Sequence, residues 1–133
     1  MKKVLSIFVL IAILAVSLVS CASFKRYEKN LSENYGIYKI SPDEMEEYDG
    51  IEDIDADDYG ISEVMLAIDI AFDNNVYIFK CGSSDDAKEL VEDLEEEIEA
   101  YNAYHNAEVL GVARDGRFVL YGTPHVINEA LGK

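Results

Sequence analysis

The side chains best suited to chemistry are the carboxylates between residues 43 and 58. This segment holds ten acids, and three of them form the pattern Asp53-x-Asp55-x-Asp57, the spacing of the oxygen ligands that open a calcium-binding loop. A complete EF-hand loop also needs glycine at its sixth position and glutamate at its twelfth, where this chain has an aspartate and a valine. The segment is therefore not an EF-hand. Weak divalent-cation binding stays open as the alternative to a solvated acidic loop.

Two arginines flank the strongest turn signal of the chain, Asp115-Gly116. A hairpin of residues 107–113 and 117–123 around this turn places Arg114 opposite Arg117. Two cations at a hairpin tip are unfavourable unless an anionic group lies nearby. That group is either an acidic helix of the same chain or the carboxylate or phosphate of a ligand, and the sequence leaves both open.

The other side chains that catalyse reactions are too few or too far apart to predict a site. The chain has two histidines, His105 and His125, and neither lies near Cys81, so no zinc-ligand spacing occurs. It has no glycine-rich phosphate loop and no Gly-x-Ser-x-Gly elbow. We therefore predict that the protein is not an enzyme, and we assign no catalytic residue, no cofactor and no metal ligand.

The first 20 residues have the composition of an export signal. Met1-Lys2-Lys3 gives a positive start, and an almost unbroken apolar run follows from Val4 to Val19. The run is shorter than the roughly 20 apolar residues of a membrane-spanning helix, and it ends on small residues before Cys21. We interpret it as a signal peptide rather than as part of the folded domain.

The end of this segment, Leu18-Val19-Ser20-Cys21, resembles the lipobox of bacterial lipoproteins, which have a type II signal peptide. In that family the cysteine thiol receives a diacylglyceryl group and the chain is cut just before it. The resemblance implies a signal peptide over residues 1–20, lipidation of Cys21, and a mature chain of residues 21–133. Acyl chains such as palmitate would anchor that chain in the lipid of the cell membrane, on the extracytoplasmic face.

The mature chain is strongly acidic. The sequence has 11 Lys and Arg against 27 Asp and Glu, and removing Lys2 and Lys3 leaves nine cations, so its formal charge is 9 − 27 = −18. Nucleic acid repels such a body, so it is excluded as a partner. Three cations, Lys25, Arg26 and Lys29, lie close to the proposed anchor. They either attract anionic lipid, by about 1 kcal/mol per charge, or form an ordinary solvated helix face.

Hydrophobic periodicity predicts three helices. The first covers residues 24–34, close to the anchor. The second begins after Ser83 and has one apolar stripe that runs from Ala87 to Tyr104. The third is short and begins at Thr123-Pro124, a helix cap followed by proline at the first helical position.

The remaining apolar segments predict strands. Residues 37–40 form a short strand, and residues 62–72 alternate as a strand does, although helical spacing also fits them. Asn74-Asn75 suits a two-residue hairpin turn into residues 76–81, which favours the strand and sets Phe72 opposite Tyr77. Cys81 ends that apolar strand and has no partner if Cys21 is lipidated, so we expect a buried, inert thiol.

These elements predict an α+β fold with two layers, in which helices pack on one face of a mostly antiparallel sheet of about five strands. We expect residues 21–133 to form a single acidic domain. Its α-β-β-α-β-β order, in which hairpins lead into amphipathic helices, resembles small uncharacterised lipoproteins of low-GC Gram-positive bacteria. Such proteins bring no assigned activity with them.

The function that we expect is a membrane-anchored, extracytoplasmic module that binds a protein partner. Both faces of the second hairpin are apolar, with Val112, Val119 and Tyr121 on one face and Phe118 and Leu120 on the other. If helices cover one face, the other is left exposed. The alternative is a lipoprotein that binds a small ligand or a divalent cation through the acidic segment 43–58 or through Arg114 and Arg117.

Overall fold

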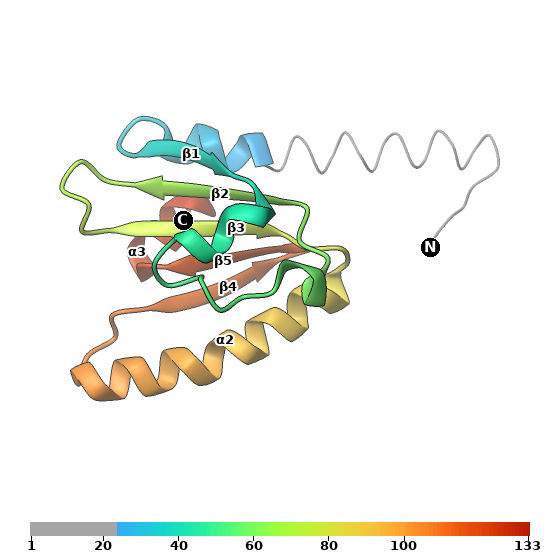
Figure 1. The fold of residues 1–133 in the computed structure, drawn as a ribbon. Coiled ribbons are helices and arrows are strands. Elements are labelled where there is room, and N and C mark those ends of the chain that lie inside the picture. Colours follow the sequence, from blue (N-terminus) through green and yellow to red (C-terminus); the bar gives the residue numbers. More distant parts are fainter. Residues whose placement is uncertain (1–23) are drawn as a thin grey trace, which may run out of the picture.

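Three central strands shape the fold because nearly every residue in them is apolar. β2 (Glu63–Ile68), β3 (Asn75–Lys80) and β5 (Phe118–Gly122) lie side by side in the computed structural model, which describes residues 24–133. β1 (Gly36–Ile40) and β4 (Gly111–Asp115) complete a five-stranded sheet in the order β1-β2-β3-β5-β4 (Figure 1). All pairings are antiparallel, so the predicted α+β class and the five-stranded sheet are confirmed.

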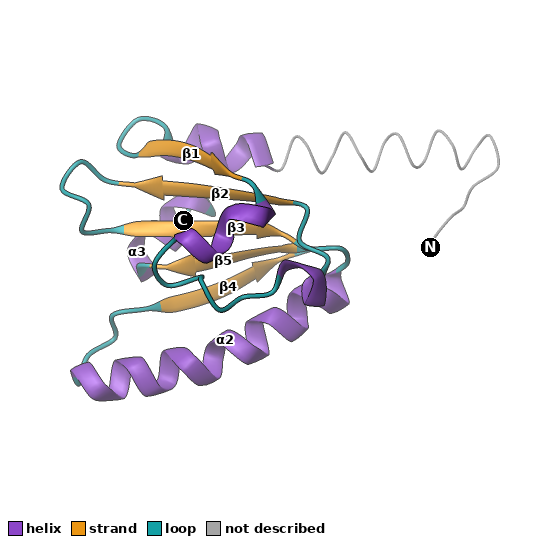
Figure 2. Ribbon diagram, in the orientation of Figure 1, coloured by secondary structure: helices purple, strands orange, loops and turns teal. Residues whose placement is uncertain are grey.

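Helical segments occupy the connections and the two ends of the described chain (Figure 2). A helix covers residues 24–31, and the acidic segment contains two short 3-10 helices, η1 (Pro42–Glu47) and η2 (Ala56–Tyr59). The long helix is α2 (Ser84–His105), and the chain ends with α3 (Pro124–Ala130). All three helices predicted from periodicity are therefore present.

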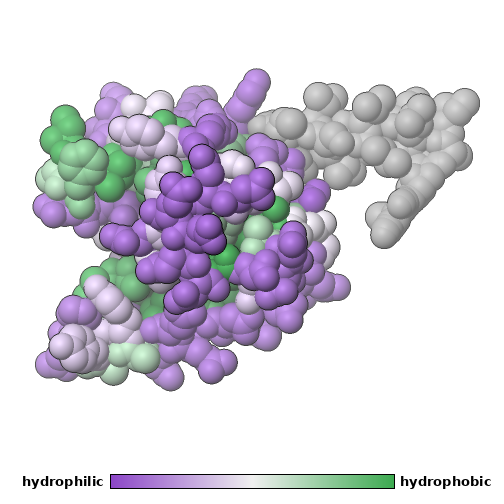
Figure 3. All heavy atoms as spheres, viewed as in Figure 1, coloured by the Kyte–Doolittle hydropathy of each residue, from purple (hydrophilic) through white to green (hydrophobic). Residues whose placement is uncertain are grey.

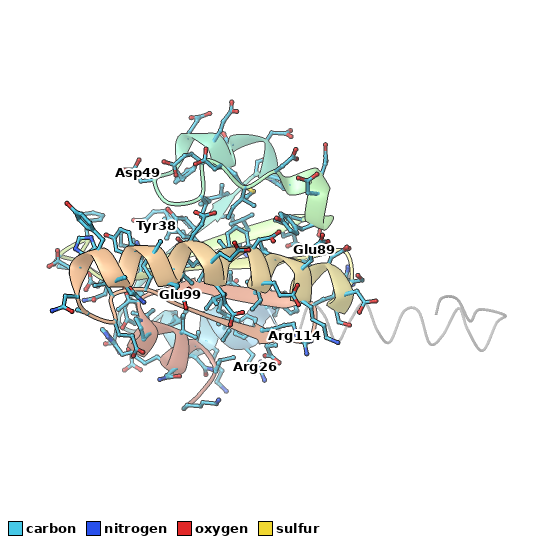
Figure 4. All side chains as sticks on the ribbon, turned by 90° about the horizontal axis from the view of Figure 1, so that it is seen from below. Arg26, Tyr38, Asp49, Glu89, Glu99 and Arg114 are labelled. Atoms are coloured by element: carbon cyan, nitrogen blue, oxygen red, sulfur yellow. The ribbon has the colours of Figure 1, made fainter. Side chains whose placement is uncertain are left out.

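Helices cover both faces of the sheet, whereas the sequence predicted helices on one face only. On one face α2, η1 and η2 pack over a first core, to which the strands contribute Val64, Leu66, Tyr77, Phe79, Val119 and Tyr121. On the other face the helix of residues 24–31 and α3 pack over a second core, to which the strands contribute Met65, Ala67, Val76, Ile78, Phe118 and Leu120. Figure 4 shows Asp49 and Arg26 on opposite sides of the sheet. Successive side chains of a strand point to opposite faces, so an unbroken apolar run needs cover on both.

This double cover removes the exposed hairpin face that the sequence predicted. Val119 and Tyr121 are buried in the first core, while Phe118 and Leu120 are buried in the second. Val112, on the edge strand β4, is partly buried against the first core. Neither face of the β4–β5 hairpin is therefore the uncovered apolar face that the sequence predicted.

The β2–β3 hairpin is confirmed as a pair of strands, but its predicted register is wrong. Leu66, not Phe72, lies opposite Tyr77. The shift is an even number of residues (72 − 66 = 6), so each side chain keeps its predicted face. In place of the two-residue turn, residues 69–74 form a loop between the strands.

The β4–β5 hairpin turns one residue later than predicted. Gly116 and Arg117 form the turn, and Gly116 adopts a φ of 65°, a left-handed conformation that glycine accepts without steric cost. The register places Arg114 opposite Val119 rather than opposite Arg117.

The start of α2 follows its sequence signal, but its end does not follow the predicted stripe. The Ser83 hydroxyl accepts a hydrogen bond from the backbone N–H of Asp86 at 3.0 Å, as a helix cap does. Leu90, Leu94 and other residues of the stripe are buried, whereas Tyr104 is 84% exposed. The helix extends past the sheet (Figure 1), so the last part of its stripe has no strand to cover.

Gly122 is a position where the fold tolerates no side chain. A Cβ atom on this residue would lie 2.3 Å from the backbone oxygen of Asn75, whereas a Cβ atom on Gly111, its partner in β4, would lie no closer than 3.4 Å to any neighbour. We predict that Gly122→Ala lowers the free energy of unfolding by about 1–3 kcal/mol, since the backbone must shift. Gly111→Ala should change it by less than about 1 kcal/mol. Urea denaturation of the two variants measures the difference, and equal stabilities would contradict this account of the Gly122 site.

Candidate functional site

Within residues 24–133, the acidic segment 43–58 contains no group of carboxylates arranged as metal ligands. Asp55 caps η2, because its Oδ1 accepts the backbone N–H of Asp57 at 3.0 Å. No group of three His, Cys, Asp or Glu side chains within residues 24–133 is arranged to hold a metal ion. The three aspartates of the Asp53-x-Asp55-x-Asp57 pattern line one concavity of about 370 Å³, but they are not arranged as metal ligands.

The two arginines of the hairpin tip act separately. Arg117 bridges the turn to the end of β3, since its Nε donates to the Cys81 carbonyl at 2.8 Å and its Nη2 donates to the Gly82 carbonyl at 3.1 Å. Arg114 donates to the carbonyl of Gly116 in its own turn, at 2.9 Å. Both guanidinium groups thus bind backbone carbonyls, and they do not converge on a common anion site.

The remaining candidate side chains, Cys81, His105 and His125, lie in the core or on helices. Cys81 is fully buried, and burial raises the pKa of its thiol to about 11, so the thiolate that would react is scarce at neutral pH. This confirms the predicted buried thiol. His105 ends α2, with its ring 4.4 Å from that of Tyr101, and His125 lies in the first turn of α3. Cys21 lies outside the described residues, and its lipidation stays a prediction.

An apolar loop tip, Ile70 and Phe72, is the most exposed hydrophobic feature of the described residues. Both belong to the 69–74 loop, and they are 95% and 72% exposed. Together with Tyr38, Ile68 and neighbouring residues they line a groove of about 470 Å³ at the start of β1 and the end of β2. Figure 3 shows apolar side chains gathered at this end of the molecule.

Asp69 holds the loop in its conformation. Its Oδ1 accepts the backbone N–H of Asp73 at 2.9 Å, and its Oδ2 accepts the side-chain amide of Asn74 at 2.8 Å. The backbone closes the loop as well, because the N–H of Asp69 donates to the carbonyl of Asn74 at 3.0 Å. Phe72 has a φ of 58°, which is rare for a bulky side chain. The apolar tip is therefore presented on a braced turn rather than on a loose one.

A second concave feature is the tyrosine cavity, of about 440 Å³, which opens on the first-core face between α2 and residues 49–54. Its walls include three tyrosines and four carboxylates, contributed by Tyr77, Tyr101, Tyr121, Asp49, Glu52, Asp53 and Glu97. The lining contains no cationic side chain. The cavity is thus aromatic and anionic at once.

Hydrogen bonds between distant segments shape this cavity. The Tyr77 hydroxyl donates to the Asp49 carbonyl at 3.0 Å, which fixes one wall against the sheet. Asn102 of α2 fixes another wall, since its Oδ1 accepts the N–H of Leu110 and its Nδ2 donates to the Leu110 carbonyl, both at 3.0 Å. Burial and the charges of Asp49 and Glu52 raise the pKa of the Tyr77 hydroxyl to about 12.

The sequence predicted neither the groove beside the loop tip nor the tyrosine cavity. Ile70 and Phe72 continue the apolar alternation of β2, so the sequence predicts them as part of the strand. The signal for a loop instead is Asp69, which lies five residues before Asn74, because aspartate side chains hydrogen-bond backbone groups in turns. The tyrosines of the cavity come from β3, α2 and β5, and no local spacing connects them.

Comparison of the chain with protein-family models, with curated proteins and with solved structures finds no match in any of the three. Among residues 24–133, no helix has the length and apolar character needed to cross a bilayer.

The hydrogen bonds that Asp69 accepts from Asp73 and Asn74 should depend on pH. The amide of Asn74, and then backbone N–H groups, stabilise the charged form and lower the pKa of Asp69. Because the folded-state pKa is depressed, the bracing is present above the usual aspartate range and is lost as the pH falls through the lowered pKa. We expect the amide protons of Asp73 and Asn74 to be protected from hydrogen exchange until the pH falls below that range.

Asp69→Ala should remove this protection at every pH, whereas Asp73→Ala, which removes a neighbouring carboxylate of the same loop, should leave the protection of Asn74 in place. NMR-detected exchange, corrected for the intrinsic exchange rates, measures both. Protection that persists in Asp69→Ala would show that the carboxylate does not hold the loop.

Proposed function

We propose that this protein is a lipoprotein, anchored at the extracytoplasmic face of the cell membrane through acylated Cys21, that binds a protein partner without catalysing a reaction. The lipobox resemblance supports the anchor. The observation that supports partner binding is the apolar loop tip, Ile70 and Phe72, which is exposed on a loop that hydrogen bonds to Asp69 brace. Exposed apolar side chains on a braced loop are typical of interaction surfaces, because little conformational entropy is lost when they bind a partner.

The position of the tip favours a partner away from the bilayer. The helix of residues 24–31 begins at one side of the molecule, and the β2–β3 loop lies at the opposite side (Figure 1). An anchor a few residues before that helix would hold its start near the lipid. Lys25 and Lys29 are exposed on this helix, where they suit an anionic bilayer surface, whereas Arg26 pairs with Asp115.

The charge of the domain favours a partner with cationic residues around an apolar site. Residues 24–133 include nine cations and 27 acids, and the groove beside the tip is lined by Glu33 and Asp69. Complementary charge speeds association and excludes anionic partners. We therefore expect apolar side chains flanked by lysine or arginine on the partner.

The anchor makes the first prediction about this function. Cys21→Ser should abolish incorporation of labelled palmitate and move the protein from the membrane fraction to the soluble fraction, because the acyl chains are lost. Cys81→Ser is the matched control and should leave labelling and membrane association unchanged. Continued labelling of Cys21→Ser would exclude this lipid attachment.

The loop tip makes the second prediction. The double variant Ile70→Ser, Phe72→Ser should reduce, at least about tenfold, the recovery of the partner cross-linked to the full-length protein in native membranes, since buried apolar anchors dominate interface energies. Its melting temperature should stay unchanged, because both side chains are exposed.

Tyr104→Ser removes another exposed aromatic side chain and should leave recovery intact. Undiminished recovery of a stoichiometric partner by the double variant would contradict docking at the tip. Transfer of the cross-links to lipid alone would indicate a membrane-facing loop instead.

A further inference from the structure

The tyrosine cavity has properties that partner docking at the loop tip does not explain. Four carboxylates line it, and none of them forms an ion pair within residues 24–133. Like charges gathered at a concave surface without a counter-charge repel one another and focus a negative potential. A bound cation would relieve that repulsion.

Tyr121 is a second observation that indicates a ligand, and it does not depend on the carboxylates. Tyr121 is only 6% exposed, and its hydroxyl has no hydrogen-bond partner among the described residues, unlike the Tyr77 hydroxyl, which binds Asp49. No side-chain polar atom of the described residues is both shut off from solvent and unpaired. Because Tyr121 lines the cavity, its hydroxyl must therefore reach that space. A nearly buried tyrosine thus presents a free hydroxyl to the cavity.

The cavity suits an organic cation better than a metal ion. Within residues 24–133 no three carboxylates are arranged as metal ligands, and the space of about 440 Å³ lies in the range of small-molecule pockets. Its walls combine aromatic rings with carboxylates, and a cation on an apolar stem is attracted by both. Burial is the largest cause that raises the pKa of the Tyr121 hydroxyl, and the negative charges of Glu97 and Glu52 raise it further. The hydroxyl therefore lies within the negative potential of these carboxylates.

We infer that the tyrosine cavity is a binding site for an ammonium or guanidinium group on an apolar stem, with Glu97 as its counter-ion and the Tyr121 hydroxyl as a hydrogen-bond acceptor. The rings of Tyr77 and Tyr101 contact the stem. This chemistry belongs both to free alkyl amines and to lysine or arginine side chains of a protein. The site is distinct from the loop tip, so it stands whether or not docking there is correct.

The test uses the full-length lipidated protein in a nonionic detergent at about 0.15 M salt, where charges farther apart than about 8 Å are screened. NMR titrations use 1,5-diaminopentane, the blocked peptide acetyl-Gly-Lys-Gly-amide, and calcium chloride at matched ionic strength. We expect saturable shifts of Tyr121 and Gly122 with at least one amine. Tighter binding of the diamine identifies a free amine as the source, and tighter binding of the peptide identifies a protein side chain.

Two matched variants separate the site from bulk charge. Glu97→Gln should weaken binding about tenfold, because it removes the counter-ion. Glu96→Gln removes the same charge from a neighbouring exposed position of α2 that does not line the cavity, and it should leave the Kd unchanged. Tyr121→Phe keeps the ring and should weaken binding by less than Glu97→Gln does.

Three results would overturn the inference: no saturable amine binding, equal weakening by Glu97→Gln and Glu96→Gln, or saturation by calcium alone. The variant Ile70→Ser, Phe72→Ser should bind the amine normally. Failure of the cavity and failure of docking at the loop tip are therefore distinguishable.

Discussion

The rest of this structure depends on a sheet whose central strands are apolar on both faces. β2, β3 and β5 place alternate side chains into two cores, and water must be excluded from each. The helix of residues 24–31 and α3 together cover the second core. Asn30 links the two helices, because its side-chain amide donates to the Ala130 carbonyl at 2.8 Å. Tyr35 adds a second link to Glu129 of α3. The start of the described chain is thus a structural part of the domain rather than a tether.

The same constraint determines where the surface is left open. α2, η1 and η2 cover the first core, and two concave features remain beside this cover. The tyrosine cavity lies between α2 and residues 49–54, and the groove lies beside the β2–β3 loop. Figure 3 shows hydrophobic and hydrophilic residues together on this side, and the linings of the two features contain tyrosines and carboxylates. The opposite side of the molecule contains the start of the helix of residues 24–31 (Figure 1). The proposed attachment site and the proposed recognition site therefore lie at different sides of the domain.

The sequence predicted local structure better than it predicted surfaces. Periodicity and capping located α2, and alternation together with a hairpin signal correctly favoured a strand over a helix for β2. The turn of that hairpin was misplaced because Ile70 and Phe72 continue the apolar alternation, while the bracing by Asp69 depends on side-chain hydrogen bonds. The second layer of helices was missed because an apolar run does not reveal which element will cover its other face. The tyrosine cavity joins three elements, so only the tertiary structure brings its residues together.

The central claim is that recognition takes place at the loop tip, on the side away from the anchor. Site-specific photo-cross-linking in intact cells tests it most directly, with a benzophenone amino acid at position 72 and, as a control, at position 92 on the exposed face of α2. Our account predicts that position 72 gives a cross-link to one protein species and that position 92 gives none. Cross-links from position 72 to lipid alone, or to the same proteins as from position 92, would contradict it.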